Sequence, residues 1–273
     1  MHLKYERFAR PDSSEGLPLP SHIPIHKRIP QTFRKRSDNL YDWDKINSMY
    51  SRNLGKIIVI IPAYNEDSRI ANVVMGSMTY LPVLVIDDGS TDETVQISRS
   101  SGAEVLLQAP NQGKGATLQA GFKRALDEGV EAVITLDADG QHDPNEIPKF
   151  LNTYYAKRTD LIIGMRDFSQ MPLIRRLANT LGTISFSWAL GQNIPDNQSG
   201  YRLISRRLMN AVLKSEESGF EFEVEMIKIC VQRGFTMDWV PISTIYAGEK
   251  SHIHPLKHLL EFLRIVLQTR RDG

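Results

Sequence analysis

The chain has 273 residues, which is enough for one large or two small domains. Charged residues make up 24%, and the formal net charge is +1, so no global basic field argues for nucleic acid as a partner. No apolar run approaches the roughly 20 residues that span a bilayer, and the sequence opens without a signal-peptide core. Any membrane contact is therefore expected to be peripheral or to depend on a partner protein.

The first 53 residues differ in pattern from the rest. Five prolines interrupt them, and a basic cluster lies at 27–36. This composition favours a solvated, partly disordered extension; the alternative is an arm that binds a membrane surface or a partner. The single cysteine, Cys230, has no intramolecular disulfide partner and fits a reducing compartment. We therefore expect a protein of the cytoplasm or of the cytoplasmic face of a membrane.

From Lys56 onward the sequence alternates between strand and helix patterns. Short apolar runs typical of buried parallel strands are each followed by an amphipathic segment, and Ser90 and Glu93 have capping-box spacing. Such alternation indicates βαβ units and a parallel sheet covered on both faces. The predicted strands are 57–61, 83–86, 104–108, 132–136 and 161–164, and the predicted helices are 67–78, 90–100, 115–128 and one opening at 143–146.

After Arg166 the rhythm changes to longer helical patterns. They predict helices at 173–190, 206–214, 223–232 and 255–270, and one strand within 236–246 that Pro241 interrupts. We see no second core boundary. The sequence thus predicts an N-terminal extension (1–53), a single α/β domain with a mainly parallel sheet (54–247), and a C-terminal loop and helical elaboration (248–273).

The most informative stretch follows the predicted strand at 132–136. Asp137 and Asp139 stand two positions apart at the strand's end, so in extended chain both side chains leave the same face. Two converging carboxylates need a cation between them, and hard oxygen donors select Mg²⁺ or Mn²⁺. Gln141 can add a carbonyl oxygen. Asp143 and Pro144 then open the next helix as N-cap and first residue.

Polar residues also follow two other predicted strands. In a parallel sheet these ends share one edge, where Glu66 and Asp88 can accept hydrogen bonds from a base or a ribose. Lys114, between two glycines, can reach phosphate oxygens; the alternative is a solvated loop lysine. A metal-assisted site for a nucleotide diphosphate is the function this edge predicts.

Seven motifs follow one another along the chain. The first four are residues 60–66 (IIPAYNE), 86–92 (IDDGSTD), 111–115 (NQGKG) and 136–142 (LDADGQH). Together they resemble the family-2 glycosyltransferases of GT-A (Rossmann-like) fold. The other three are 196–202 (DNQSGYR), 222–226 (FEVEM) and 240–242 followed by 248–251. These are similar to the branch that transfers mannose or glucose to dolichyl or polyprenyl phosphate.

The resemblance implies roles for individual residues. The nucleotide and donor would contact Arg166, Lys250 and the Asp137-Ala138-Asp139 motif, with the metal on Asp137, Asp139 and Gln141. Asp196 would sit beside the acceptor, supported by Arg202. The remaining donor-binding residues would be Pro62, Tyr64, Glu66, Asp87, Asp88 and Lys114.

These residues imply a metal-dependent (Mg²⁺ or Mn²⁺), inverting transfer of a hexose from a donor of the GDP-mannose or UDP-glucose type to a polyprenyl phosphate, as in the synthesis of cell-envelope glycans. The alternatives are transfer to a soluble or glycan hydroxyl, and a non-catalytic sugar-nucleotide-binding subunit. The apolar face of 255–270 predicts that this helix lies in a membrane interface or packs on the domain core.

Overall fold

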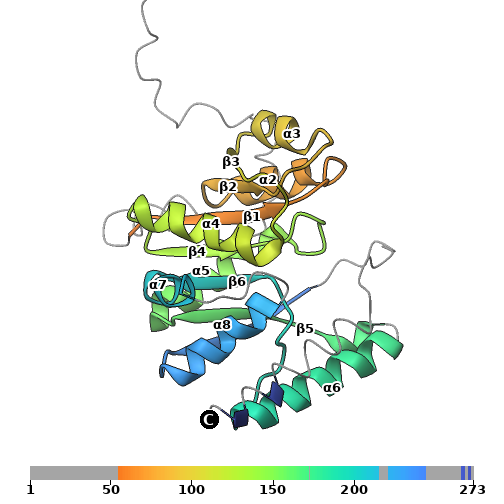
Figure 1. Ribbon diagram of the computed structural model, residues 1–273, viewed down its shortest axis with the longest axis vertical. Helices are drawn as coiled ribbons and strands as arrows, with labels where there is room; N and C mark the ends of the chain where they lie inside the picture. The colour runs from red at the N-terminus through yellow and green to blue at the C-terminus, as the bar shows by residue number, and fades with distance from the viewer. Residues whose placement is uncertain (1–54, 172, 215–220, 244–265, 268–269, 272–273) are drawn as a thin grey trace, which may run out of the picture. The chain divides into compact units, whose positions relative to one another are not determined.

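The computed structural model describes residues 55–171, 173–214, 221–243, 266–267 and 270–271 (Figure 1). All of these belong to one unit, Ser51–Gly273. The predicted N-terminal extension, Lys250 and most of the predicted helix 255–270 lie outside the described residues, so the proposed domain boundaries stay predictions.

The described residues build a sheet of seven strands in the order β3-β2-β1-β4-β6-β5-β7. All neighbouring pairs are parallel except those of β6, which runs antiparallel to both β4 and β5. The mainly parallel sheet predicted from the sequence is therefore confirmed. The strands are β1 (Ile57–Ala63), β2 (Val83–Asp87), β3 (Glu104–Leu107), β4 (Ala132–Thr135), β5 (Leu161–Arg166), β6 (Arg202–Ser205) and β7 (Met237–Ile242).

Helices cover both faces of this sheet (Figure 1). Ile58 and Ile60 of β1 belong to one core cluster, and Ile57, Val59 and Ile61 to the other, which is why the strand reads as an unbroken apolar run. Helices α4 (Lys114–Asp127), α6 (Leu173–Leu190), α7 (Arg206–Val212) and α8 (Glu221–Gln232) pack with the first cluster, and α2 (Ile70–Met78) and α5 (Ile147–Lys157) with the second.

Three local predictions are corrected. The Ser90–Glu93 capping box does not form: Ser90 Oγ accepts from Asn65 N (2.9 Å), and Asp92 Oδ1 accepts from Thr94 N (3.0 Å) at the start of α3 (Thr94–Ser100). β6 was missed, because a four-residue strand beginning with an arginine shows little apolar pattern. β7 continues through Pro241. Proline has no N–H, but β7 is an edge strand, and the N–H groups on the outer side of an edge strand have no partner in the sheet.

The helix predicted to begin at Asp143 is confirmed. Its first turn is a 3-10 turn. Asp143 Oδ1 accepts from Asn145 N (2.9 Å) at the 3-10 turn η3 (Pro144–Glu146), and α5 follows at once. A second such turn, η4 (Phe168–Gln170), follows β5. In the described part of the chain no helix is both long and apolar enough to span a membrane.

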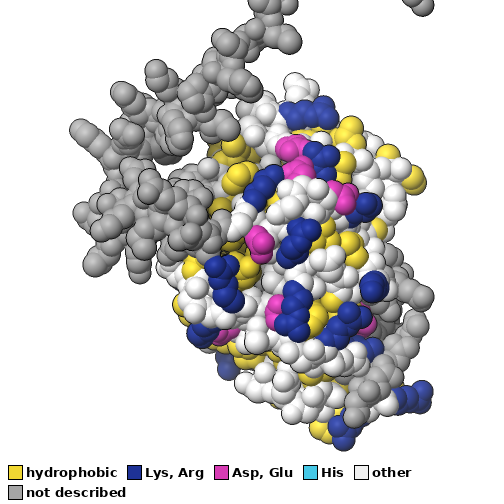
Figure 2. All heavy atoms as spheres, turned by 90° about the vertical axis from the view of Figure 1, so that its left-hand side faces the viewer, with side chains coloured by type: hydrophobic (Ala, Val, Ile, Leu, Met, Phe, Trp, Pro, Cys, Tyr) yellow, Lys and Arg dark blue, Asp and Glu magenta, His cyan; other side chains and the backbone are white. Residues whose placement is uncertain are grey.

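Figure 2 shows the face at the left of Figure 1, where β1 begins, with basic and acidic side chains interspersed. The opposite ends of the parallel strands, β1, β2 and β4, carry the residues singled out from the sequence.

Candidate active site

The loops after β1, β2 and β4 meet at one edge of the sheet, as predicted. Ala63 is paired with Asp87, and Ile60 with Thr135, so the three strands end side by side. The loops are joined by Asn65, whose side-chain oxygen accepts from Thr91 N (2.9 Å) and whose backbone adopts a left-handed φ of 54°. The edge is thus a fixed platform built by adjacent loops.

The Asp87 and Asp88 carboxylates are both buried in this platform. Asp88 accepts from Gln112 N and Gly113 N (2.9 Å each) and so holds the loop that leads into α4. Asp87 Oδ2 accepts from the backbone of the next turn, whereas Asp87 Oδ1 is buried and has no hydrogen-bond partner among the residues that the structure describes. Of the two, Asp87 offers the unused acceptor, while Asp88 shapes the loop.

The other residues predicted to contact the nucleotide line the same edge. Tyr64 is 48% exposed, Pro62 is half-buried, and Glu66 pairs with Arg69 (3.1 Å). Burial raises the pKa of Glu66, and the Arg69 guanidinium opposes that rise. Tyr64 is thus the large side chain at this edge that is open to a ligand.

Asp137 and Asp139 lie directly beyond β4. Leu136 and Ala138 are buried, whereas Asp137 and Asp139 are half-buried, because successive side chains in an extended chain point to opposite faces. Asp139 Oδ1 accepts from Gln141 N (2.9 Å). Burial and the neighbouring charge of Asp137 raise the pKa of Asp139. The pair therefore carries the like-charge strain that a bound cation would relieve.

Lys114 supplies a cation at this point. Its Nζ lies 2.6 Å from Asp137 Oδ1 and 3.0 Å from Glu223 Oε1 of α8. Burial alone would raise the pKa of Asp137, but the Lys114 ammonium lowers it to about 2. The sequence predicts a lysine that reaches phosphate oxygens. In the structure its ammonium pairs with the carboxylates of Asp137 and Glu223, and the contact with phosphate stays a prediction.

Gly200 leaves the space that the Asp137 carboxylate occupies. A Cβ added at Gly200 would lie 2.7 Å from Asp137 Oδ2, and Thr135 Oγ1 donates to Gly200 O (2.7 Å). His142 is buried; its Nδ1 accepts from Asp137 N (3.3 Å), and its ring lies against Tyr201. Burial lowers the pKa of His142 and so favours the neutral imidazole.

Asp196 is fully buried and bound to Arg166 at the end of β5. Arg166 Nε donates to Asp196 Oδ2 (2.7 Å) and Arg166 Nη2 to Asp196 Oδ1 (2.9 Å), a bidentate pair. Asp196 Oδ1 also accepts from the backbone of Gln198 (3.1 Å) and Ser199 (3.2 Å). Both carboxylate oxygens are therefore engaged within the protein.

Arg202, predicted to support the site beside Asp196, is fully buried and binds backbone carbonyls. Its guanidinium donates to the carbonyls of Ser199 (2.7 Å), Glu223 (2.6 Å) and Asn197 (3.3 Å). It ties the 196–200 turn to α8, whereas Arg166 is the cation that pairs with Asp196. Glu223 is thus attached to the site through both its backbone carbonyl and its carboxylate.

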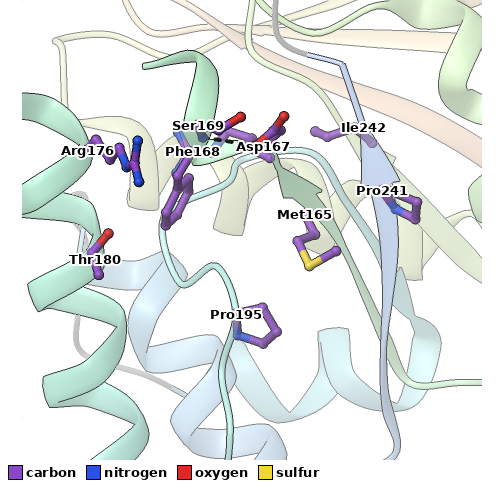
Figure 3. A pocket seen from close by; sticks show the side chains of 10 residues that line it. Met165, Asp167, Phe168, Ser169, Arg176, Thr180, Pro195, Pro241 and Ile242 are labelled. Atoms are coloured by element: carbon purple, nitrogen blue, oxygen red, sulfur yellow. Dashed lines mark hydrogen bonds between the residues drawn. The ribbon is translucent and has the colours of Figure 1, made fainter. Parts of the chain in front are cut away.

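A pocket of about 490 Å³ opens beside Arg166. In Figure 3 its lining side chains come from the end of β5, the η4 turn, α6, the Pro195 segment and β7, and they include the guanidinium of Arg176. Its full lining is Met165, Arg166, Asp167, Phe168, Ser169, Arg176, Thr180, Pro195, Pro241 and Ile242. The pocket therefore joins a cationic end to an apolar wall.

The donor set fits a divalent metal of the Mg²⁺ or Mn²⁺ class. Asp137, Asp139 and Gln141 offer oxygen ligands, and an ammonium already neutralises one of the carboxylates. Among the described residues no group of three His, Cys, Asp or Glu is assembled into a closed metal site. A metal held here would keep positions open for other oxygen ligands.

Comparison with known proteins decides the family. The sequence model of the protein family "Glycosyl transferase family 2" matches residues 58–213, which is more than half of the chain. This chain belongs to glycosyl transferase family 2. It is a glycosyltransferase, as predicted from its motifs.

Two relatives of this chain indicate its branch within the family. It is 30% identical over 217 residues to UDP-N-acetylglucosamine–dolichyl-phosphate N-acetylglucosaminyltransferase of Methanococcus voltae, covering 70% of this chain and 86% of the relative. It is 30% identical over 205 residues to undecaprenyl-phosphate mannosyltransferase of Micrococcus luteus, covering 70% and 84%. The glycosyltransferase thus belongs to the polyprenyl-phosphate branch recognised in the sequence.

A solved structure has the same fold. Glucosyl-3-phosphoglycerate synthase from Mycobacterium tuberculosis, in complex with phosphoglyceric acid, aligns with a TM-score of 0.66 at 18% identity. The match covers 86% of this chain and 85% of that one. The predicted GT-A fold is confirmed.

Proposed function

We propose that this glycosyltransferase transfers a hexose, with inversion, from a nucleotide-diphosphate sugar to the phosphate of a polyprenyl phosphate, and that it requires Mg²⁺ or Mn²⁺. The names of the two relatives, which act on dolichyl and undecaprenyl phosphates, support this acceptor class. The competing proposal is transfer to a sugar hydroxyl. The two differ in whether the acceptor must lose a proton during attack.

The observation that carries the proposal is the environment of Asp196. A hydroxyl acceptor needs a general base, and the resemblance makes Asp196 the candidate. Its carboxylate is fully buried, and it is occupied by Arg166 and by backbone N–H groups. A carboxylate so engaged is a poor base, because taking a proton would break a charge-assisted pair. A phosphate monoester, with a second pKa near ~6, is already anionic at neutral pH and needs no base.

The pocket beside Arg166 provides a place for that phosphate. Arg166 and Arg176 both line it, and planar guanidinium groups suit phosphate oxygens. Asp196 then acts as a positioning residue, because its bidentate pair fixes the orientation of Arg166. The acceptor phosphate would be held at this end of the site by the two guanidinium groups, with the Asp167 carboxylate also in the pocket lining.

Helix α6, which lines part of the pocket, also carries a stripe of exposed apolar side chains. Arg176 and Thr180 line the pocket, and the exposed large apolar residues of the same helix recur at helical spacing. They are Leu177, Leu181, Ile184 and Trp188, each 55–64% exposed. An exposed apolar stripe beside a cationic pocket suits an acceptor with a phosphate head and an isoprenoid tail.

The donor would lie across the edge formed by β1, β2 and β4. Asp137 and Asp139, with Gln141, would hold the metal, and Asp87 Oδ1 and Tyr64 would meet the nucleoside. When bound, the metal would neutralise the charge that develops on the leaving diphosphate. The structural relative has been crystallised with Mg²⁺ and uridine diphosphate, which is consistent with this assignment.

The test is a panel of UDP- and GDP-sugars, each assayed with Mn²⁺ for hydrolysis and for transfer to a short polyprenyl phosphate. We expect one donor to give a lipid-linked sugar with inverted anomeric configuration, and no product in excess chelator. Full transfer in chelator would remove the metal from the proposal. Transfer to hydroxyl acceptors alone would favour the competing proposal.

A further inference from the structure

Lys114 lies where three elements of the site converge. It is the first residue of α4, and its ammonium reaches Asp137 beyond β4 and Glu223 at the start of α8. The side chain is only 18% exposed, and those of Asp137 and Glu223 are 27% and 8% exposed. Partly buried charges at such distances interact strongly. The three groups form a lysine bridge between two carboxylates.

The bridge and a metal would use the same carboxylate. Asp137 Oδ1 lies 2.6 Å from the ammonium, and a Cβ added at Gly200 would lie 2.7 Å from Asp137 Oδ2 and 2.8 Å from Oδ1, so no side chain at position 200 could share the space around this carboxylate. Placing a divalent ion on Asp137 would therefore bring two cations to one carboxylate. Their repulsion would favour movement of Lys114 away from Asp137.

Glu223 provides the place to which Lys114 would move. Arg202 Nη1 donates to the backbone carbonyl of Glu223 (2.6 Å), which fixes the start of α8. The Glu223 side chain is buried and already within 3.0 Å of the ammonium. Lys114 can thus leave Asp137 and remain paired with a buried carboxylate.

We infer that Lys114 is a built-in counter-ion of the metal site, which neutralises Asp137 while the metal is absent and shifts to Glu223 when the metal binds. This inference rests on the proposed function, because it takes Asp137 as a metal ligand. It assigns to Lys114 and Glu223 the control of metal affinity. Metal would then bind weakly to the protein alone.

The experiment measures Mn²⁺ affinity of the full chain without nucleotide, by calorimetry or by the loss of the free-ion EPR signal. Lys114→Met removes the competing charge and should tighten Mn²⁺ binding about tenfold or more. Glu223→Gln weakens the second anchor, leaves Lys114 more firmly on Asp137, and should loosen Mn²⁺ binding. Lys114→Arg keeps the charge and should stay near the wild-type value.

Lys123→Met is the matched control, because it removes the same charge from the exposed side of the same helix, where Lys123 pairs with Asp127. It should leave Mn²⁺ affinity unchanged. Thermal unfolding adds an independent measure: Mn²⁺ should raise the melting temperature of Lys114→Met more than that of wild type.

Unchanged or weaker Mn²⁺ binding by Lys114→Met would overturn the inference, as would tighter binding by Glu223→Gln. If wild type and variants bind no Mn²⁺ even with a nucleoside diphosphate, both this inference and the metal requirement of the proposed function fail. If all of them bind Mn²⁺ equally, only the inference fails.

Discussion

At the scale of single residues, the proposed function makes Asp196 a residue that positions Arg166 and not a general base. Asp196→Asn keeps the shape of the side chain but removes the charge that orients Arg166. We expect nucleotide binding to change little and transfer to polyprenyl phosphate to fall by about 10²-fold or more. Parallel measurements of nucleotide affinity and of kcat check this.

The pH profile of the same variant separates positioning from base catalysis. If the acceptor phosphate is the titrating group, transfer should fall as the pH drops below ~6 in both wild type and Asp196→Asn. The acid limb should keep its midpoint, because Asp196 does not supply it. A limb that disappears in the variant would identify Asp196 as the base.

A substitution of Asp139 tests the proposed metal requirement. Asp139→Asn halves the charge of the Asp137–Asp139 pair, and we expect activity to fall by orders of magnitude. Asp143→Asn is the matched control, since it makes the same change four residues on, where asparagine still caps η3. Equal activity of the two variants would argue against a metal on Asp139.

The residues after the strands could be predicted because a parallel sheet brings these ends together. Their partners could not. Lys114 and Glu223 are far apart in the sequence, and either would be an ordinary surface residue on another fold. The signals that were available are a lysine between two glycines, and a glutamate flanked by the buried Phe222 and Val224.

At the scale of elements, the amphipathic pattern of α6 predicted a helix but not its surroundings. Its inward residues, such as Phe186 and Ala189, are buried, and a second set of apolar residues remains exposed. Local pattern cannot tell an apolar face that packs on the core from one that faces outward, because both have the same period. The same limit applies to β6, which is placed by its neighbours β4 and β5.

The exposed face of α6 predicts contact with lipid. Leu181→Lys combined with Ile184→Lys should reduce flotation of the full chain with liposomes of uncharged (zwitterionic) lipid, because it places two charges on the apolar stripe. Stability should change little, since both positions are more than half exposed. Met75→Lys on α2, also exposed, is the control and should float like wild type. Unaltered flotation of the double variant would rule out this face.

At the scale of the whole molecule, the alternation of strands and helices predicted the α/β class, whereas the order of the strands came only from the structure. The insertion of antiparallel β6 between β4 and β5 depends on contacts between distant segments. That insertion brings the 196–200 turn, which precedes β6, against Asp137. The side of the site that we propose for the acceptor is thus a consequence of the overall topology.

Cys230 offers a probe of global unfolding. It is fully buried in α8, and burial raises the pKa of its thiol to about 12, so the reactive thiolate is scarce at neutral pH. We expect a disulfide reagent to label it only when the fold opens. Nucleoside diphosphate with Mn²⁺ should slow the labelling, because it binds the folded state. Fast labelling under native conditions, unaffected by ligand, would contradict this.

The central claim is that the acceptor attacks through a phosphate oxygen that is already anionic. The most direct test compares transfer from one sugar nucleotide to a polyprenyl phosphate and to the polyprenol of the same chain length, with Mn²⁺ and at equal concentrations. The account predicts a glycosylated product from the phosphate and no detectable product from the alcohol. Equal or faster transfer to the polyprenol would contradict it.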